Sequence, residues 1–537
     1  MTQDAVPSNY GSNRLRKRHW QPDRLLLNSM AILLAVLALW PLIGLIREAL
    51  QGFINGSASL GVDGPQQIQG TLTLLIGTSL LGGLLGTANG WLLANCRFPG
   101  RRALRVAQLL PLATPAYLLS AILIDLGSRN AIRIHGMGWG ILIMALTTYP
   151  YVFLLSTESF SICGRRQLEA CRSLGVGPWN SFRRIALPMA LPAIGAGIAL
   201  MGMEVVNELG AVALLAIPSL SAGIVETWQM EGNPAGAIGL AMIALIIVMS
   251  LVGYERRLRR RSRRWTEGVA GGDSPAWQLD GLRALCAQCL ALIPPTITLG
   301  VPLLWAILNL DQLEQGIDPD LIPLTERSLG LGLAAASLAV VAGLILAIAK
   351  RWSPARWMGN LSFMAGIGYA IPGAVMAIAL MPFNGAPWNL AWILLLLWGY
   401  SDRFLAVAKG GLDAAFERLS PSLDEAATGL GCQWQEVLRR VHLPLLKGPL
   451  AVGALLVFVD TVKELPLTFV LRPFDFDTLS VRLYQYAADE RMAESILPAL
   501  IIIALGLIAS MALVPGLDQG EQKSLSSTKL ATDKSLI

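Results

Sequence analysis

Residues 169–192 read EACRSLGVGPWNSFRRIALPMALP, and residues 425–448 read EAATGLGCQWQEVLRRVHLPLLKG; we call these two stretches the repeat segments. Each holds a Glu-Ala pair, a glycine six residues after the glutamate, two adjacent arginines and a Leu-Pro. The glycine allows a positive φ and a sharp reversal, and proline is tolerated in the first turn of a helix. Each segment is therefore predicted to form a short helix, a glycine turn and an element leading into the next apolar helix. Eight residues recur without a gap 256 positions later: Glu169, Ala170, Leu174, Gly175, Arg183, Arg184, Leu187 and Pro188.

The sequence around the repeat segments is strongly apolar. Of 537 residues, 54% are hydrophobic and only 15% are charged, and the mean hydropathy is +0.55. This composition excludes an ordinary soluble globular protein and indicates an integral membrane protein. Runs long enough to approach or exceed a membrane span occur at 25–46, 71–95, 104–126, 137–156, 185–217, 235–254, 284–309, 328–349, 360–381, 388–408, 444–471 and 495–516, and the two long runs 185–217 and 444–471 are candidates for broken helices.

The runs divide into two sets of six, which predicts an all-α membrane protein with about twelve transmembrane helices. Because each set contains an even number of spans, the two repeats are parallel, and a pathway is expected between them. Pro115 and Pro372 lie inside apolar helices at similar places, which favours kinked helices lining a cavity or, equally, ordinary membrane prolines. The predicted organisation is a cytoplasmic tail (1–24), a first transmembrane repeat (25–254), a basic cytoplasmic linker (255–282), a second transmembrane repeat (283–516) and a disordered cytoplasmic tail (517–537).

The positions of Lys and Arg predict the orientation. Short loops rich in positive residues stay in the cytoplasm. If the N-terminus is cytoplasmic, all but eight of the 42 Lys and Arg residues lie in or beside inside segments. Both termini are therefore expected in the cytoplasm, and the net charge of +6 reflects this sorting and does not indicate nucleic-acid binding. The eight outer residues are Arg47, Arg129, Arg133, Arg327, Lys463, Arg472, Arg482 and Arg491.

The cysteines agree with this orientation and predict no disulfide framework. All six lie in or beside predicted cytoplasmic segments, where thiols stay reduced. Cys286 and Cys289 form a CxxC at the start of an apolar helix, without the second ligand pair of a zinc site. The first apolar run is interpreted as a retained signal anchor. The other four cysteines are Cys96, Cys163, Cys171 and Cys432.

The repeat segments resemble the EAA loop of permease subunits in binding-protein-dependent ABC importers. The resemblance rests on EACRSLG with RIALP and on EAATGLG with RVHLP, with Cys171 standing where that family usually has Ala. It covers both halves and implies a type I ABC importer permease fold. In that family the loop is a coupling helix that seats in a groove of an ATPase subunit. The resemblance thus assigns ATPase coupling to Glu169, Ala170, Gly175, Glu425, Ala426 and Gly431.

The same resemblance implies the partners and the location. The chain has no GxxxxGK[ST] phosphate loop, so ATP and Mg are expected on separate partner chains and no cofactor on this one. Two ATPase subunits would bind at the cytoplasmic face and a periplasmic substrate-binding protein at the other, with membrane lipid around a multi-pass protein of the bacterial inner (plasma) membrane. His19, His135 and His442 are dispersed and no nucleophile with a base is visible, so no catalytic residue is expected and the chain is predicted to be a transport subunit, not an enzyme.

Paired acids continue the 256-residue repeat. Glu204 and Glu208 correspond to Asp460 and Glu464, and i, i+4 spacing predicts both carboxylates of a pair on one helical face. Sixteen residues separate Pro188 from Glu204, about 24 Å of helix, which places the acids in the outer part of the membrane. Ionised acids there should face a cavity, water or partners, and carboxylates suit a hard cation.

The pathway role of these acids has an alternative. Asn207 corresponds to Lys463, and both are candidate pathway or gate residues. Alternatively, Lys463 pairs with an acid across the interface and the other acids lie at the wet outer edge. No residue is firmly assigned as a metal ligand.

Two further stretches resemble fused ferric-iron permeases. They are MEVVNELGAV at residues 203–212 and DTVKELPLTFVLRPFDFDTLSVRLYQYAADER at residues 460–491. This resemblance implies ferric iron as the substrate and an outside loop that contacts the binding protein through Arg472, Asp475, Asp477 and Arg482. Plain loop structure with turn caps is the alternative for those four residues.

Other functions remain open at this stage. Fused thiamine permeases are the nearest rival, followed by polyamine and oxyanion permeases, because all of them share the coupling motif. A twelve-span secondary transporter is a different class. It would work without ATP, but it leaves the paired repeat segments unexplained.

Overall fold

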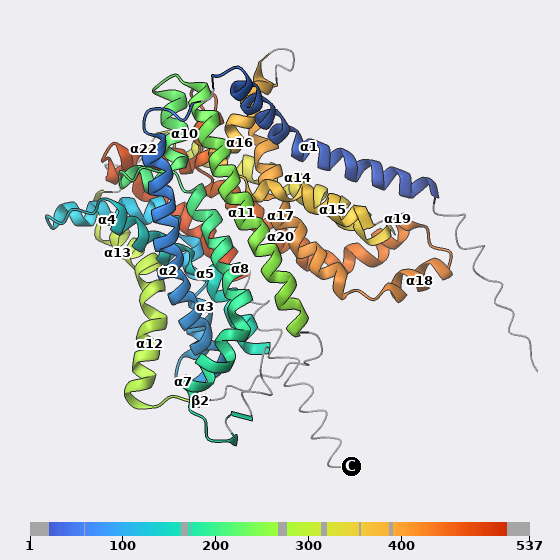
Figure 1. Cartoon of the computed structure of the whole chain (residues 1–537), viewed down its shortest axis with the longest axis horizontal. Helices are drawn as coiled ribbons and strands as arrows, with labels where there is room; N and C mark the ends of the chain where they lie inside the picture. The colour runs from blue at the N-terminus through green and yellow to red at the C-terminus, as the bar shows by residue number, and fades with distance from the viewer. Residues whose placement is uncertain are drawn as a thin grey trace, which may run out of the picture.

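The computed structural model describes residues 21–57, 59–162, 170–171, 173–266, 277–312, 319–353, 356–385 and 390–512 (Figure 1). The helices of the first half are α1 (Gln21–Ile54), α2 (Gly64–Asn95), α3 (Arg101–Ala107), α4 (Ala116–Arg129), α5 (Met137–Ile162), α7 (Pro178–Ser181), α8 (Leu187–Asn207), α9 (Gly210–Leu214), α10 (Leu220–Gln229) and α11 (Pro234–Thr266). Those of the second half are α12 (Gly281–Pro295), α13 (Val301–Leu308), α14 (Leu321–Trp352), α15 (Arg356–Ala365), α16 (Gly373–Leu380), α17 (Trp392–Arg418), α18 (Pro421–Gly429), α19 (Trp434–Val437), α20 (Leu443–Lys463), α21 (Pro466–Leu471), α22 (Leu479–Ala488) and a last helix, Met492–Ala512.

The internal repeat of the sequence is also a repeat of structure. Both bounds of α8 recur 256 positions later in α20, and both bounds of α7 recur in α19 at the same offset. Helix α5 packs against both α2 and α8, as α17 packs against both α14 and α20. The prediction of two equivalent halves built from helices is confirmed.

Membrane-spanning helices dominate the described residues. Nine of them are long and apolar enough to cross a membrane, and eleven if each of two sharply bent helix pairs counts as one span. Each predicted run contains a helix or a bent pair. Helix α17, which covers the predicted run from residue 392 onward, is not among the eleven, and it carries Asp402, Arg403 and Lys409.

The two bent pairs lie at the prolines that the sequence pointed to. Residues Arg101–Ala113 and Ala116–Arg129 meet at 88°, and residues Trp357–Ala370 and Gly373–Asn384 meet at 106°. Pro115 and Pro372 stand directly before α4 and α16 with ψ angles of 147° and 141°, outside the helical region, and proline has no N–H to donate to the turn before it. The expected kinks are therefore full breaks.

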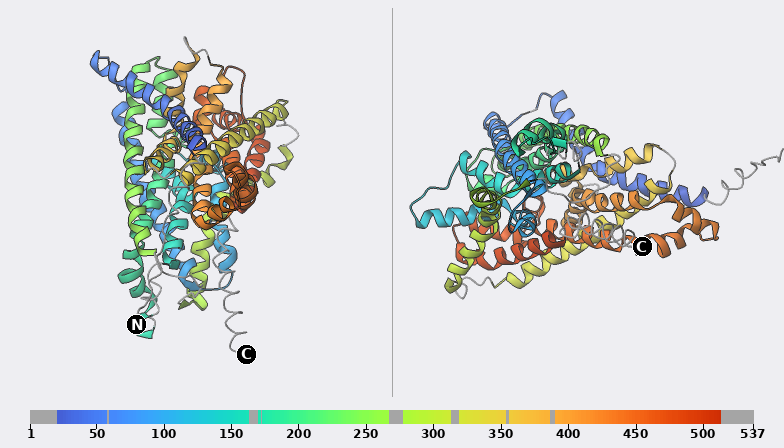
Figure 2. Two further views of the ribbon diagram at one scale, coloured as in Figure 1. Left: turned by 90° about the vertical axis from the view of Figure 1, so that its right-hand side faces the viewer. Right: turned by 90° about the horizontal axis from the view of Figure 1, so that it is seen from below.

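The first helix of each half packs against the other half. Helix α1 contacts α14, α15 and α16, whereas α12 contacts α2 and α3, and α13 contacts α4. In Figures 1 and 2 the blue α1 lies along yellow and orange helices of the second half, and α12 stands beside α2 and α3. Each half is thus completed by a helix from the other.

A small parallel sheet, which the sequence analysis did not predict, ties the two halves together. Strand β1 (Cys96–Arg97) pairs with β2 (Trp277–Gln278). The five described cysteines are free, and burial raises the pKa of the Cys96 thiol to about 11. That thiol therefore stays protonated at neutral pH.

Several predicted segments fall partly or wholly outside the described residues. Residues 1–20 cover most of the predicted first tail, 513–537 include the whole of the second, and 267–276 form the middle part of the predicted linker. The linker was expected to begin at residue 255, but α11 continues to Thr266, so its basic start extends the membrane helix.

Candidate functional site

Each repeat segment forms the predicted glycine turn. Gly175 has φ 73° and Gly431 has φ 86°. After α18, the Cys432 N–H donates to the Ala427 carbonyl at 3.1 Å and the Gly431 N–H to that of Thr428 at 3.0 Å, which is a Schellman motif. In the first copy the Val176 N–H donates to the Cys171 carbonyl at 2.9 Å, the same long bond 256 positions earlier.

The tips of both repeat segments project from the molecule. Leu174 and Leu430, which immediately precede the two glycines, are 80% and 86% exposed. Figure 1 shows α7 at the bottom and α18 and α19 at the right, so the two segments lie well apart. Ala170, Glu425 and Ala426 are described with these segments, whereas Glu169 lies outside the described residues. The coupling role of all six predicted residues stays a prediction.

The Leu-Pro of each segment begins α8 or α20, as expected, but the helical conformation already starts before it. The helices begin earlier, at Pro178 and Trp434, and pass through π-helical turns at Phe182–Ala186 and Leu438–His442. Pro188 and Pro444 come directly after these turns. A wider turn accommodates a proline ring inside a continuous helix, which explains why the motif recurs with the π turns.

A buried histidine ties the second repeat segment to the rest of the protein, and the first segment has no counterpart to it. His442, 1% exposed, lies 2.7 Å from Asp424 Oδ1, and Arg351 Nε donates to Asp424 Oδ2 at 3.0 Å. Asp424 thus links α18 to α14 and to the π turn. The corresponding position for His442 in the first half is Ala186, so the first segment lacks this link.

The predicted pathway residues of both halves line one cavity of about 150 Å³ between the halves. Its charged members are Glu204, Glu208, Arg403, Asp460, Lys463 and Glu464, and Asn207, Thr147, Tyr117, Tyr151 and Tyr369 also line it. Broken helix ends around Pro111, Leu112, Pro115 and Ala116 supply part of the wall. The structure therefore brings together all four predicted acids and both predicted gate residues.

The acids of each pair do not share one helical face, and that prediction is wrong. Helices α8 and α20 end at Asn207 and Lys463, and Glu208 and Glu464 follow in extended conformation. The Glu208 carboxylate accepts from the Ala211 N–H at 2.9 Å and the Glu464 carboxylate from the Leu467 N–H at 3.1 Å. Each of these acids therefore caps the short helix that follows.

The second acid of the second half carries a buried ion pair. Arg403 Nη1 lies 2.9 Å from Glu464 Oε1, and both side chains are 6% exposed. Lys463 binds Asp460 on its own helix at 3.0 Å, so it does not pair with an acid across the interface.

Three hydrogen bonds cross between the halves at this cavity. The Tyr369 hydroxyl donates to Glu204 Oε1 at 3.1 Å. The Gly373 N–H donates to Asn207 Oδ1 at 2.7 Å, and Lys463 Nζ donates to the Leu112 carbonyl at 3.4 Å. Tyr151 of the first half adds a second bond to Glu204 Oε1, at 3.2 Å. Polar contacts beside the cavity thus join the two halves.

The two walls of the cavity differ in charge. The first half contributes Glu204 and Glu208 and no cation, whereas the second half contributes two acids and two cations. At the positions of Arg403 and Lys463, 256 residues earlier, the first half has Thr147 and Asn207. The first wall is therefore acidic and the second is balanced.

The sequence analysis missed several cavity residues. Arg403 stands in the middle of an apolar run, where ionisable residues are functional candidates by default, and this signal could have found it. Tyr117, Tyr151 and Tyr369 give no such signal. Among the described residues no three His, Cys, Asp or Glu side chains lie close enough to hold a metal ion, the CxxC cysteines included.

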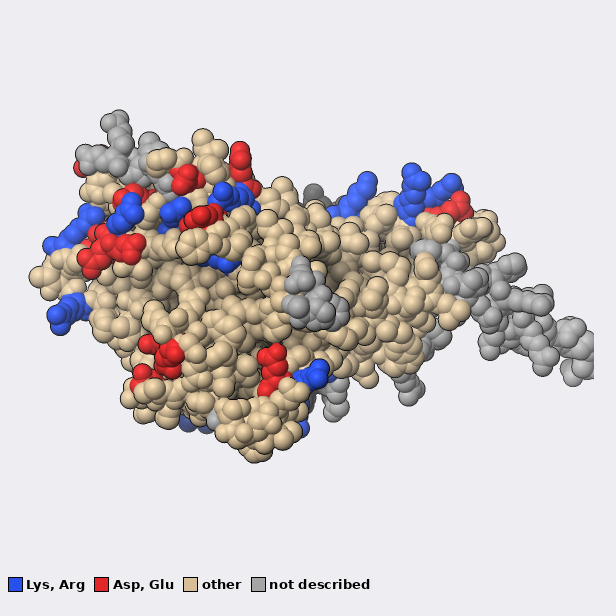
Figure 3. Space-filling model, turned by 90° about the horizontal axis from the view of Figure 1, so that it is seen from above, with Lys and Arg blue, Asp and Glu red and all other residues tan. Residues whose placement is uncertain are grey.

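The four predicted binding-protein contacts lie together at the far end of the molecule from α18. Asp477 pairs with both Arg472 and Arg482, the latter at 3.4 Å, and Arg327 Nη1 donates to the Asp475 carbonyl at 3.3 Å. Figure 3 shows positive and negative side chains interleaved over part of the face seen from above, where α10 and α22 lie. Their contact role stays a prediction.

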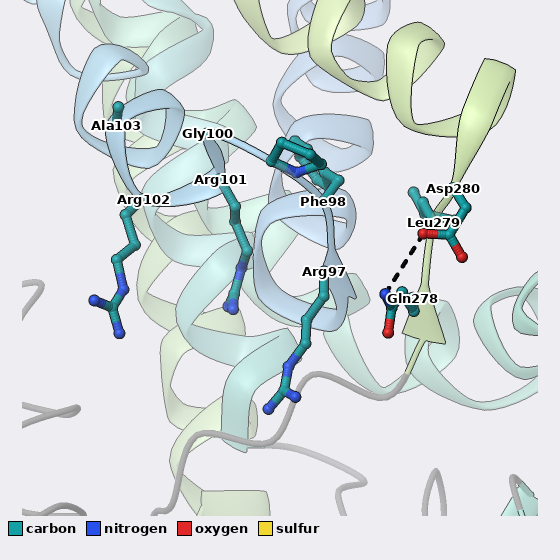
Figure 4. A pocket seen from close by; sticks show the side chains of 10 residues that line it. Arg97, Phe98, Gly100, Arg101, Arg102, Ala103, Gln278, Leu279 and Asp280 are labelled. Atoms are coloured by element: carbon teal, nitrogen blue, oxygen red, sulfur yellow. Dashed lines mark hydrogen bonds between the residues drawn. The ribbon is translucent and has the colours of Figure 1, made fainter.

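A second, larger hollow of about 760 Å³ lies beside the strands β1 and β2. Arg97, Arg101 and Arg102 point to the same side of it, and Gln278 donates to Asp280 at 3.5 Å (Figure 4). Arg101 Nε also donates to the Leu93 carbonyl at 2.8 Å, which caps the end of α2. Arginines at the end of a span suit the negatively charged inner leaflet, so we interpret this hollow as part of the membrane-surface anchor.

Comparison with known proteins places both halves in one family. The family model described as "Binding-protein-dependent transport system inner membrane component" matches residues 86–264 and 339–520. The chain is 26% identical to the "Fe(3+)-transport system permease protein FbpB 2" of Haemophilus influenzae, over 81% of this chain and 87% of that protein.

Relatives named for other substrates match about a third of the chain. The "Sulfate transport system permease protein CysT" of Escherichia coli is 29% identical over 36% of this chain and 76% of its own length. The "Molybdenum transport system permease protein ModB" of Escherichia coli is 28% identical over 32% of this chain and 83% of its own length.

Proposed function

The chain belongs to the family of binding-protein-dependent transport system inner membrane components, and from this premise we propose that its two halves form the pathway for ferric iron in an ABC importer. It is a transport subunit and not an enzyme, as predicted. The family match covers both halves, which argues against the secondary transporter that the sequence alone left open.

The observation that carries the ferric-iron proposal is the charge of the central cavity. Four carboxylates and two cations line it, and the two charged residues that the first half contributes are both acids. Carboxylate and hydroxyl oxygens suit a hard cation, whereas sulfate or molybdate would be repelled by the acidic wall. The relative named for Fe(3+) transport spans both halves of the chain, which supports the same substrate.

The repeat segments bind two separate ATPase subunits in this proposal, and those subunits hold ATP and Mg. Each short helix would seat in a groove of one ATPase, with the exposed leucines Leu174 and Leu430 supplying apolar contact. The glycine turns fix the direction in which each helix projects. Two segments on one chain account for two ATPase subunits.

Closure of the ATPase pair would draw the repeat segments together and rock one half against the other. The continuous helices that run from α7 to α8 and from α19 to α20 connect each segment to the cavity. The movement would break the cross-half hydrogen bonds of Glu204, Asn207 and Lys463 and open the cavity to one side at a time.

The proposed orientation puts both termini and the repeat segments in the cytoplasm of a bacterium and the ends of α10 and α22 in the periplasm. The distribution of Lys and Arg supports it. A periplasmic binding protein would deliver iron at that outer end.

Reconstitution tests the function and the substrate together. The permease and its ATPase would be placed in liposomes, and binding proteins loaded with ferric iron, thiamine, polyamine, sulfate or molybdate would be added outside. Stimulated ATP hydrolysis and uptake of labelled iron are expected with the ferric protein. Stimulation by another loaded protein, with none by the ferric one, would overturn the substrate assignment, and uptake without ATP would overturn the mechanism.

A further inference from the structure

The two halves present different turns at the end opposite to the repeat segments. Residues 215–219 join α9 to α10, and residues 472–478 join α21 to α22, so the second turn is two residues longer. Each turn contains a non-glycine residue with positive φ, Ala216 at 49° and Asp475 at 61°. The first turn is packed inward, with Ile217 only 3% exposed, whereas the second exposes 99% of Phe474.

Several contacts hold the longer turn rigid while leaving the phenylalanine without support. Arg472 and Arg482 both pair with Asp477, which is 9% exposed. Arg327 donates to the Asp475 carbonyl at 3.3 Å, and the Leu479 N–H donates to Ser328 Oγ at 2.8 Å. The backbone on either side of Phe474 is thereby tied to α14 and α22. The turn is held in place by these contacts, but the Phe474 ring itself is exposed and does not pack against the described part of the protein.

We propose that Phe474 is the anchor by which the binding protein docks on the second half, its ring filling an apolar pocket of that protein. This inference rests on the proposed function and adds the residue that makes the contact. An aromatic side chain buries roughly 150–250 Å², and aromatic residues inside a polar rim dominate the binding energy of interfaces. A preformed turn also loses less conformational entropy on binding than a flexible one.

The charges around Phe474 favour a protein over lipid as the partner that its ring contacts. Arg472, Asp475 and Asp477 lie within three residues of the ring, on both sides of it. Positive and negative groups around an apolar centre match the rim of a protein interface, whereas acids beside an exposed ring disfavour insertion into a bilayer. The predicted contacts Arg472, Asp477 and Arg482 then act as positioning residues that fix the turn.

Titration of the binding protein on the reconstituted transporter tests the proposal. Phe474→Ala is expected to raise the concentration of loaded binding protein needed for half-maximal ATPase stimulation about thirtyfold, as for an interface hot spot. Phe474→Trp should keep most of the affinity. The control is Met230→Ala, because Met230 is an apolar side chain of the first half that is 82% exposed, at the end of α10, and its loss should leave the titration unchanged.

Photo-cross-linking gives a readout that does not depend on activity. With p-benzoylphenylalanine in place of Phe474, the loaded binding protein should be captured, and with the same group at Met230 capture should be weak. Capture of lipid in place of protein at 474, or a Phe474→Ala titration equal to that of Met230→Ala, would overturn the anchor. Failure of every loaded binding protein to stimulate the wild-type transporter would instead contradict the proposed function.

Discussion

Arg403 is the residue on which the electrostatic balance of the second half depends. Its guanidinium neutralises Glu464, and both groups are withdrawn from solvent. Removing one partner of a buried pair leaves an uncompensated charge, which costs far more than the loss of an exposed pair. Replacing Arg403 by an uncharged residue would also make the second-half wall of the cavity acidic, because two acids would then face one cation.

We expect Arg403→Met to lower the free energy of unfolding by about 3–5 kcal/mol. The matched control is Lys350→Met, because Lys350 pairs with Asp413 at 3.4 Å and is 38% exposed; its loss should cost about 1 kcal/mol or less. Adding Glu464→Gln to Arg403→Met should recover much of the loss. Urea titration in detergent measures all three, and equal costs for Arg403→Met and Lys350→Met would contradict the buried pair.

At the residue level, the charged members of the cavity could largely be predicted from the sequence. Glu204, Glu208, Asp460 and Glu464 stood out because acids are rare in apolar runs and because they recur at the repeat offset. Arg403 was missed because its counterpart is Thr147, so it breaks the repeat that guided the search. Tyr151 and Tyr369 could not be predicted, since aromatic residues are ordinary in membrane helices and only folding brings them to Glu204.

The glycine turns are the elements that set the direction of the repeat segments. A side chain added at Gly431 would meet nothing within 4 Å, so the cost of replacing it comes from the positive φ alone. Gly429 offers a comparison inside the same segment, because it ends α18 without positive φ and is equally open.

Gly431→Val is therefore expected to reduce binding-protein-stimulated ATP hydrolysis severalfold, because it would turn α18 away from the groove of the ATPase subunit. Gly431→Asn should be less affected, because asparagine tolerates the left-handed region. Gly429→Ala should behave like the wild type. Coupled ATPase activity in liposomes is the measurement. Normal activity of Gly431→Val would show that the turn does not couple the segments to ATP hydrolysis.

At the level of elements, the sequence predicted the helices better than their ends. The long runs 185–217 and 444–471 are broken, as the sequence indicated, but the positions of the breaks, at Asn207 and Lys463, were not predicted, although Gly210 and Pro466 follow closely. Proline has no N–H to donate and disfavours a helical residue before it, so Pro466 was a signal that could have been used. The strand pair β1–β2 could not be predicted, because it joins residues far apart in the chain.

The exchange of first helices makes the two halves of the molecule interdependent. Helix α1 covers α14, α15 and α16, and α12 and α13 cover helices of the first half. Either half alone would therefore expose apolar surface that its own helices cannot cover.

A chain divided within residues 267–276 is expected to assemble when both halves are expressed together. Each half alone should aggregate or be degraded. Removing residues 21–54 from the first half should lower the yield of the second half in particular, because α1 packs on it. Co-purification from detergent measures assembly, and two halves that purify separately as monodisperse, stable proteins would contradict the interdependence.

The two halves belong to one chain, so each wall of the cavity has its own stretch of sequence and can change without the other. In a symmetric homodimer every substitution would occur in both walls, because the two subunits have the same sequence. Fusion of the halves removes this constraint, and the acidic wall with Thr147 and Asn207 has diverged from the balanced wall with Arg403 and Lys463. Single substitutions in one half can thus change the substrate selectivity of one wall, while separate substitutions in the other half change how the cavity closes.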